Sequence, residues 1–110
     1  MCGRYTLAMS HPELEARFDF RTSDFSWIPR YNIAPTQSVV AVLNNGERHA
    51  RLLRWGLVPY GAKDLRVGNR MINARAETIT RPGVFLKSFK QRRCLIIADG
   101  FYEWKKEGQK

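Results

Sequence analysis

The chain has 110 residues, of which 44% are hydrophobic, so its length and composition suit one globular domain with a buried core. It has no signal peptide and no apolar stretch long enough to span a bilayer, so neither a secreted nor a membrane-bound protein is expected. Nineteen Lys and Arg residues against ten Asp and Glu leave a formal charge of +9, which points to a polyanionic partner such as nucleic acid, although an inert basic surface would carry the same charge.

The first part of the chain predicts one strand and one helix. We expect the strand over residues 4–7, and Pro12 at a first helical position begins a short helix that ends near Phe18. A loop with embedded aromatic side chains follows. In residues 30–37, Pro35 excludes a regular central strand, because its nitrogen has no proton to donate to a sheet.

The next part of the chain predicts a β-hairpin. Residues 39–43 are rich in β-branched side chains and lead into Asn44-Asn45-Gly46, which is typical of tight turns between antiparallel strands. The return strand is expected over residues 48–55. Further expected elements are a loop around Gly61 and Gly68, a strand near residues 71–75, a short helix within 80–90, a buried strand at 93–98 and a strand at 101–104. Together these elements predict an antiparallel-rich α+β fold.

The start of the chain offers a specific chemistry. Removal of Met1, which the small residue at position 2 favours, would leave Cys2 with a free α-amine beside its thiol. An aldehyde can condense with this amine to an imine, and the thiol can then close on the imine carbon to form a thiazolidine. The α-amine titrates near pH 7.7–8.0 in model peptides, so part of it is neutral under cell conditions. The plain alternative is that Cys2 is only the second residue of a translated chain.

The two cysteines, Cys2 and Cys94, predict neither a disulfide framework nor a metal site. Cys94 begins an apolar run, where a free thiol usually acts as a small hydrophobic side chain. We therefore expect no metal, no cofactor and a reducing compartment, the cytoplasm.

Five short segments carry a resemblance to a known family. They are Met1-Cys2-Gly3-Arg4, Tyr31-Asn32-Ile33-Ala34-Pro35-Thr36, Trp55-Gly56-Leu57-Val58-Pro59, Asn73-Ala74-Arg75-Ala76-Glu77-Thr78 and Asp99-Gly100-Phe101-Tyr102-Glu103-Trp104. In this order they resemble the SRAP family, the SOS-response-associated sensors of abasic sites. Each segment alone is a weak signal, whereas five in order over nearly the whole chain are specific.

The resemblance implies a mixed or bifurcated sheet, or a barrel, with a few short helices in a single domain over residues 1–110. It implies a lyase-type enzyme that crosslinks itself through Cys2 to abasic sites in single-stranded DNA after DNA damage, associated with the nucleoid when bound. A thiol autopeptidase activity is implied as well. The family domain continues to a histidine in a His-Asp-Arg-Met-Pro type motif, which His11 and His49 do not match, so we expect the domain to be incomplete at its C-terminal side.

Glu103 is the expected proton donor, because capture of an aldehyde requires water to leave the carbinolamine. In the sequence it sits among Phe101, Tyr102 and Trp104, and apolar surroundings would disfavour its charged form. The resemblance places the catalytic glutamate of the family at this position. The alternative is a glutamate on the solvated face of an edge strand.

Asn73 and Arg75 alternate along an expected strand and would therefore share one face. The resemblance assigns the catalytic asparagine and a DNA-contacting arginine to these positions, and Arg4 is the next expected phosphate contact. The alternatives are an asparagine at a strand edge and an arginine lying over the core. Asn32 would brace the Cys2 pocket, or simply form a turn.

Trp55, Trp104 and Tyr31 could stack on bases beside a lesion, although core packing is an equal expectation for aromatic residues in strands. Two other functions stay open at this point. One is an N-terminal-nucleophile hydrolase, in which the α-amine serves as base for the thiol and no aldehyde is needed. The other is a non-catalytic protein that binds single-stranded DNA by charge alone. The oligomeric state is not indicated.

Overall fold

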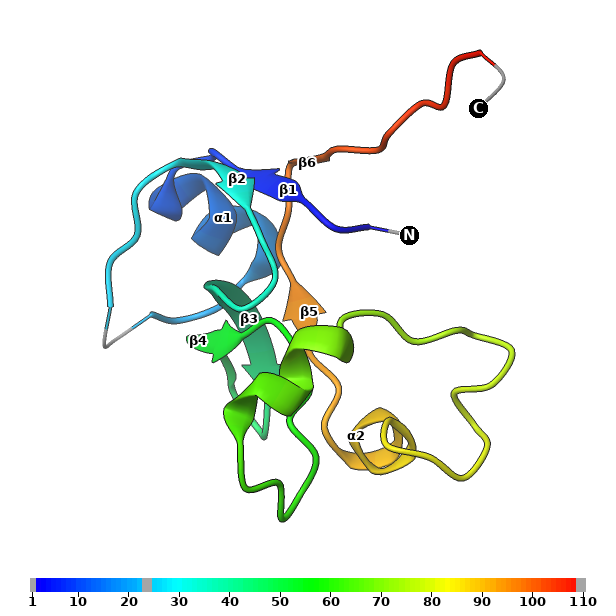
Figure 1. Cartoon of the computed structure of the whole chain (residues 1–110). Coiled ribbons are helices and arrows are strands. Elements are labelled where there is room, and N and C mark those ends of the chain that lie inside the picture. The colour runs from blue at the N-terminus through cyan, green and yellow to red at the C-terminus, as the bar shows by residue number, and fades with distance from the viewer. Residues whose placement is uncertain (1, 23–24, 109–110) are drawn as a thin grey trace.

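The computed structural model describes residues 2–22 and 25–108, which form two antiparallel three-stranded sheets and three short helices (Figure 1). The elements are β1 (Tyr5–Leu7), α1 (His11–Phe18), β2 (Arg30–Ile33), β3 (Ser38–Asn44), β4 (Arg48–Arg54), η1 (Leu65–Arg70), α2 (Leu86–Gln91), β5 (Leu95–Ile96) and β6 (Gly100–Phe101). None of the helices in this described part is long and apolar enough to cross a membrane.

The strands are ordered β2-β1-β6 in one sheet and β4-β3-β5 in the other. Residues 95–101 connect the two sheets, because β5 pairs with β3 and β6 pairs with β1. Figure 1 shows this segment running from one sheet to the other. The predicted antiparallel α+β class is confirmed. Both sheets are open in the described residues, so the barrel form of the expectation is not formed there.

The hydrophobic core joins both sheets to α1. Its buried members are Tyr5, Leu7, Leu14, Phe20, Ile33, Val39, Val40, Val42, Ala50 and Ile97. They come from β1, α1, β2, β3, β4, the linking segment and, for Phe20, the loop after α1, so burial of apolar surface ties these elements into one unit.

Helix α1 begins where the sequence predicts, with a capping box. The Ser10 hydroxyl accepts a hydrogen bond from the Glu13 backbone N–H at 3.4 Å, and the Glu13 carboxylate accepts one from the Ser10 N–H at 3.2 Å. Pro12 lies in the first turn, where its missing N–H costs no hydrogen bond. Leu14 faces the core and is fully buried. Asp19 ends the helix in the left-handed conformation, with φ 50°.

The predicted hairpin is also confirmed. Strands β3 and β4 pair in continuous register from Ser38 opposite Arg54 to Asn44 opposite Arg48. Gly46 in the turn has φ 110°, a conformation that glycine adopts without steric cost.

The prediction of a strand near residues 71–75 is wrong, because these residues form a loop. The Met71 N–H donates to the Gly68 carbonyl at the end of η1, and the Met71 carbonyl accepts from the Leu57 N–H. The Ile72 carbonyl accepts from the Trp55 indole N–H. Local partners therefore satisfy backbone groups that a sheet would otherwise have used.

Other elements differ from the expectation in length and burial. Strand β2 forms ahead of Pro35, as an edge strand, which the proline does not prevent. The buried strand expected at 93–98 shortens to Leu95–Ile96, whose side chains are exposed, and only Ile97 next to them is buried. The strand expected at 101–104 shortens to Gly100–Phe101, and the second helix covers only 86–91.

Helix η1 replaces part of the loop that was expected around Gly68. A Cβ on Gly56 would collide with the Gly68 carbonyl oxygen, and Gly56 has φ 129°. The close approach of these two backbone segments therefore requires glycine at position 56.

Asp99 ties the linking segment to the start of the chain. Its carboxylate accepts hydrogen bonds from the Thr6 hydroxyl at 2.6 Å and from the backbone N–H groups of Ala8 at 2.6 Å and Met9 at 2.9 Å. Burial acts to raise the pKa of Asp99, but these hydrogen bonds outweigh it and hold the pKa below its ordinary value. One side chain thus fixes the turn between β1 and α1 against the segment that leads into β6.

Asp99→Ala is expected to lower the free energy of unfolding by about 0.5–1.5 kcal/mol at neutral pH, because it removes the acceptor of two backbone N–H groups at a position where water can partly replace it. The folded pKa lies below the unfolded one, so the carboxylate stabilises the fold above its unfolded pKa and loses this effect as the pH falls through the folded pKa. The difference between the wild type and the variant should therefore narrow below about pH 4. Urea unfolding at neutral and acidic pH measures it. Glu47→Ala, at an exposed position of the hairpin, is the control, and equal losses in the two variants would contradict the prediction.

Candidate functional site

Cys2 lies on the extended residues that lead into β1 and is half-buried. Its thiol donates a weak hydrogen bond to the Arg4 carbonyl, with Sγ 3.7 Å from the oxygen. The side chain therefore has a defined direction and still borders open space. Met1, whose removal the predicted chemistry requires, lies outside the described residues.

Asn73 meets the start of the chain directly. Its side-chain amide donates to the Cys2 carbonyl oxygen at 3.3 Å, across a sequence separation of 71 residues. The expectation that Asn73 and Arg75 share one face of a strand is wrong, since both lie in the loop between η1 and α2. The loop nevertheless brings Asn73 to Cys2, as its predicted role requires.

Trp55 supports this loop. Its indole N–H donates to the Ile72 carbonyl at 3.4 Å, one residue before Asn73. Its ring packs against Tyr5 of β1, with 5.5 Å between ring centroids and 56° between planes. Trp55 is half-buried and contacts the core, as the packing alternative expects, and its role as a DNA contact stays a prediction. Trp104 and Tyr31, in contrast, are 93% and 65% exposed.

Arg4 is held between the neighbouring strands of its sheet. Its guanidinium donates to the Asn32 side-chain oxygen at 3.1 Å, and its carbonyl accepts from the Tyr102 N–H at 3.0 Å. The Tyr102 hydroxyl donates to the Tyr31 carbonyl at 2.8 Å. Asn32 therefore braces the residues around Cys2, through Arg4 rather than by contact with the thiol.

Glu103 and Arg75 are exposed in this structure. Glu103 follows directly on Tyr102, whose backbone bonds to Arg4. The apolar enclosure expected around Glu103 is not formed in the described residues, because Phe101 and Trp104 are themselves largely exposed. The roles predicted for Glu103 and Arg75 stay predictions.

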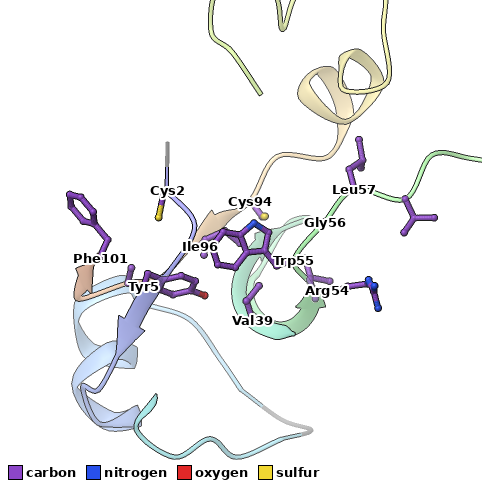
Figure 2. Close-up of a pocket in the computed structure, with 13 residues that line it drawn as sticks. Cys2, Tyr5, Val39, Arg54, Trp55, Gly56, Leu57, Cys94, Ile96 and Phe101 are labelled. Carbon is purple, nitrogen blue, oxygen red and sulfur yellow. The ribbon is translucent and has the colours of Figure 1, made fainter. Parts of the chain in front are cut away.

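A cavity of about 790 Å³ opens beside Cys2, between the two sheets (Figure 2). Its lining residues are Cys2, Tyr5, Val39, Leu53, Arg54, Trp55, Gly56, Leu57, Val58, Cys94, Ile96, Ala98 and Phe101. Most of this wall is apolar. Burial raises the pKa of the Cys94 thiol, which keeps it protonated at neutral pH.

Tyr5 is a cavity residue that the sequence analysis did not single out. Burial raises the pKa of its phenol, the charge of Arg30 lowers it, and the charge of Cys2 raises it further. The only signal in the sequence is the alternation of Tyr5 with Leu7, which puts both side chains into the core. Within residues 2–22 and 25–108 no group of His, Cys, Asp and Glu side chains could hold a metal ion.

The family model described as "SOS response associated peptidase (SRAP)" matches residues 1–110. The chain is 46% identical over 112 residues to the abasic site processing protein YoaM of Bacillus subtilis, covering 96% of this chain and 48% of the relative. It is 34% identical over 120 residues to the abasic site processing protein YedK of Escherichia coli, covering 100% of this chain and 50% of the relative. The chain thus spans about half the length of the curated relatives it matches.

A solved structure of a protein from Bordetella bronchiseptica has the same fold. The two superpose with a TM-score of 0.72 at 23% identity, over 93% of this chain and 50% of the other. At this identity the likeness concerns the fold alone.

Asn73→Ala is expected to loosen the segment that carries Cys2, because it removes the donor to the Cys2 carbonyl. Hydrogen exchange at the Tyr102 amide, which donates to the Arg4 carbonyl, should become faster, while the free energy of unfolding changes by no more than about 1 kcal/mol. Exchange followed by mass spectrometry of the peptide that contains Tyr102 tests this. Asn45→Ala, in the hairpin turn, is the matched control, and the prediction is wrong if both variants exchange at the wild-type rate.

Proposed function

The chain belongs to the SOS response associated peptidase (SRAP) family, and from this premise we propose that it captures abasic sites in single-stranded DNA by a covalent bond to Cys2. The proposal is supported by the names of its relatives in Bacillus subtilis and Escherichia coli, which are abasic site processing proteins. It is also supported by the formal charge of +9, which suits a polyanionic partner.

The observation that carries the proposal is the hydrogen bond from Asn73 to the carbonyl of Cys2. It holds the backbone of the reacting residue in place while the thiol stays at the border of a cavity. A reacting group that is positioned before the substrate arrives avoids much of the entropic cost of the encounter. A chain terminus is usually free to move, so this restraint suits a nucleophile better than an ordinary N-terminus.

The chemistry uses the amine and thiol of Cys2 together. An abasic deoxyribose opens to an aldehyde, and the α-amine adds to the carbonyl carbon to give a carbinolamine. Loss of water forms the imine. The thiol sulfur then adds to the imine carbon while its proton passes to the nitrogen, which closes the thiazolidine. The loss of water from the carbinolamine requires a proton donor, and we assign this role to Glu103.

Arginines supply the contacts to the DNA backbone in this proposal. Arg75 is exposed near Asn73 in the sequence and is free to approach a phosphate. Arg4 is already oriented by Asn32, so its guanidinium is presented in one direction. Neither contact depends on base identity, which suits a protein that recognises the absence of a base.

The reaction needs Cys2 as the first residue. We propose that Met1 is removed before capture, and the description of the family as peptidases makes the Cys2 thiol itself a candidate for this step. Attack of the thiol on the Met1 carbonyl and hydrolysis of the resulting thioester would free both the methionine and the Cys2 amine.

Purified protein whose intact mass shows Cys2 as the first residue is expected to form an adduct with an abasic single-stranded oligonucleotide that survives denaturing electrophoresis. Cys2→Ala should lose the adduct completely, because the ring cannot close without the thiol. Cys94→Ala is the matched control, since Cys94 borders the same cavity and should give the wild-type yield. An undiminished yield from Cys2→Ala would end the proposal, as would an adduct with intact DNA.

Arg75→Gln is expected to weaken binding of single-stranded DNA through the loss of one phosphate contact. The slope of log affinity against log salt concentration should fall in magnitude by about 0.7, the value for one released counterion on a single strand. Fluorescence anisotropy with the Cys2→Ala background separates binding from reaction. Arg51→Gln, at an exposed position on β4, is the control, and an unchanged slope for Arg75→Gln would remove Arg75 from the interface.

A further inference from the structure

Thr36 has a backbone conformation that suits its residue type poorly. Its φ is 77°, in the left-handed region, which a β-branched residue rarely adopts. In the described part of the chain Asp19 is the other non-glycine residue with a positive φ, but it ends helix α1, and aspartate tolerates this conformation. Strain of this kind persists only where the surrounding contacts enforce it, and it is concentrated at functional sites. The neighbours of Thr36 must therefore hold it in place.

Thr36 is the third residue of a tight turn over residues 34–37. The Gln37 N–H donates to the Ala34 carbonyl at 3.2 Å, which closes the turn. Pro35 at the second position and a positive φ at the third are features of a type II turn, in which glycine is the usual third residue. The turn thus has a shape that its own sequence disfavours at one position.

The side chain of Gln37 supplies a restraint on this shape. Its Oε1 accepts a hydrogen bond from the Ala34 N–H at 3.1 Å and another from the Arg30 guanidinium at 2.7 Å. The same guanidinium donates to the Ser38 carbonyl at 2.6 Å. Arg30 is the first residue of β2 and Ser38 the first of β3, so Gln37 joins the turn to both flanking strands.

The turn is bonded directly to Trp55. The Thr36 N–H donates to the Trp55 carbonyl, and the Trp55 N–H donates to the Gln37 carbonyl, both at 3.0 Å. These two bonds hold the Trp55 backbone just beyond the end of β4. Because residues of the turn make both bonds, the position of the Trp55 backbone depends on the shape of the turn.

Trp55 connects the turn to Cys2. Its indole N–H donates to the Ile72 carbonyl at 3.4 Å, and the next residue, Asn73, donates to the Cys2 carbonyl at 3.3 Å. Trp55 and Cys2 also border the same cavity (Figure 2). A continuous set of hydrogen bonds and one rigid aromatic side chain therefore lead from the turn to the backbone of Cys2.

We propose that Gln37 is a positioning residue for the capture of abasic sites by Cys2. Its side-chain oxygen holds the turn in the strained conformation, the turn sets the Trp55 backbone, and Trp55 sets the loop whose Asn73 restrains Cys2. A nucleophile held in its productive geometry reacts faster, because less freedom is lost on the way to the transition state. This inference rests on the proposed function, since the reaction that it concerns is the one proposed for Cys2.

The test follows capture of an abasic single-stranded oligonucleotide at rising DNA concentrations, with DNA in excess over protein that begins at Cys2. Gln37→Met removes the acceptor and keeps the length of the side chain. Its limiting rate should fall about three- to tenfold, the effect of one neutral hydrogen bond, while the half-saturating DNA concentration stays within about twofold. Gln37→Glu keeps an acceptor oxygen and should retain the wild-type limiting rate. Partial unfolding would instead lower the final yield of adduct.

Asn44→Leu is the matched control. The Asn44 side-chain oxygen accepts from the Gly46 N–H at 3.2 Å, so this variant also removes an acceptor from a turn. That turn lies at the opposite end of the β3–β4 hairpin from Trp55. Asn44→Leu should therefore capture DNA at the wild-type limiting rate, and a fall equal to that of Gln37→Met would contradict the inference.

Thr36→Gly provides a second background in which to remove the acceptor, should Gln37→Met alone not fold. Glycine adopts the left-handed conformation without steric cost, so this background relieves the strain of the turn. Gln37→Met should lower the limiting rate there too, again about three- to tenfold. An adduct that forms at equal limiting rates with and without the acceptor overturns only this inference. No adduct from the wild type overturns the proposed function, and the positioning role with it.

Discussion

The position of Cys2 depends on the pairing of β1, a strand of only three residues that lies in the middle of its sheet. Strand β2 bonds to one edge of β1 and β6 to the other, so the residues that precede it cannot fray as a free terminus would. Arg4 extends this restraint toward the start of the chain, because its carbonyl accepts from Tyr102 and its side chain donates to Asn32. Asn73 adds a restraint from outside the sheet, because its side-chain amide donates to the Cys2 carbonyl. The reactivity proposed for one terminal residue is therefore a property of a sheet assembled from distant parts of the chain.

Trp55 connects this sheet to the rest of the site. Its ring packs on Tyr5 of β1 in one sheet. Its backbone directly follows β4 of the other sheet. Its indole N–H donates to the carbonyl of Ile72. The next residue, Asn73, donates to the carbonyl of Cys2. Trp55 thus packs against the core, one of the two roles that the sequence left open for it, and base stacking by Trp55 stays a prediction. This packing shapes two features at once, the loop that carries Asn73 and the wall of the cavity.

The same arrangement separates two kinds of surface around one nucleophile. Toward solvent lie Arg4 and the loop with Arg75, which suit an anionic strand. Toward the interior lies an apolar cavity that Tyr5 and Trp55 border. Cys2 lies where these two surfaces meet, because it borders the cavity and is half-buried. Selectivity would then follow from which surface the remainder of the substrate contacts.

The sequence by itself determined several local elements and the candidate reacting group, Cys2. Capping residues around Pro12 define α1, a run of β-branched residues and Gly46 define the hairpin, and the order of five motifs indicates Cys2 and Asn73 as candidate site residues. These signals are readable because they depend on neighbours within a few residues. The tertiary structure alone decided that residues 71–75 form a loop, that Asn32 contacts Arg4, and that the ring of Tyr5 borders a cavity. Each of these depends on contacts between segments far apart in the chain, and no local pattern of side chains encodes which distant group will satisfy a given donor or acceptor.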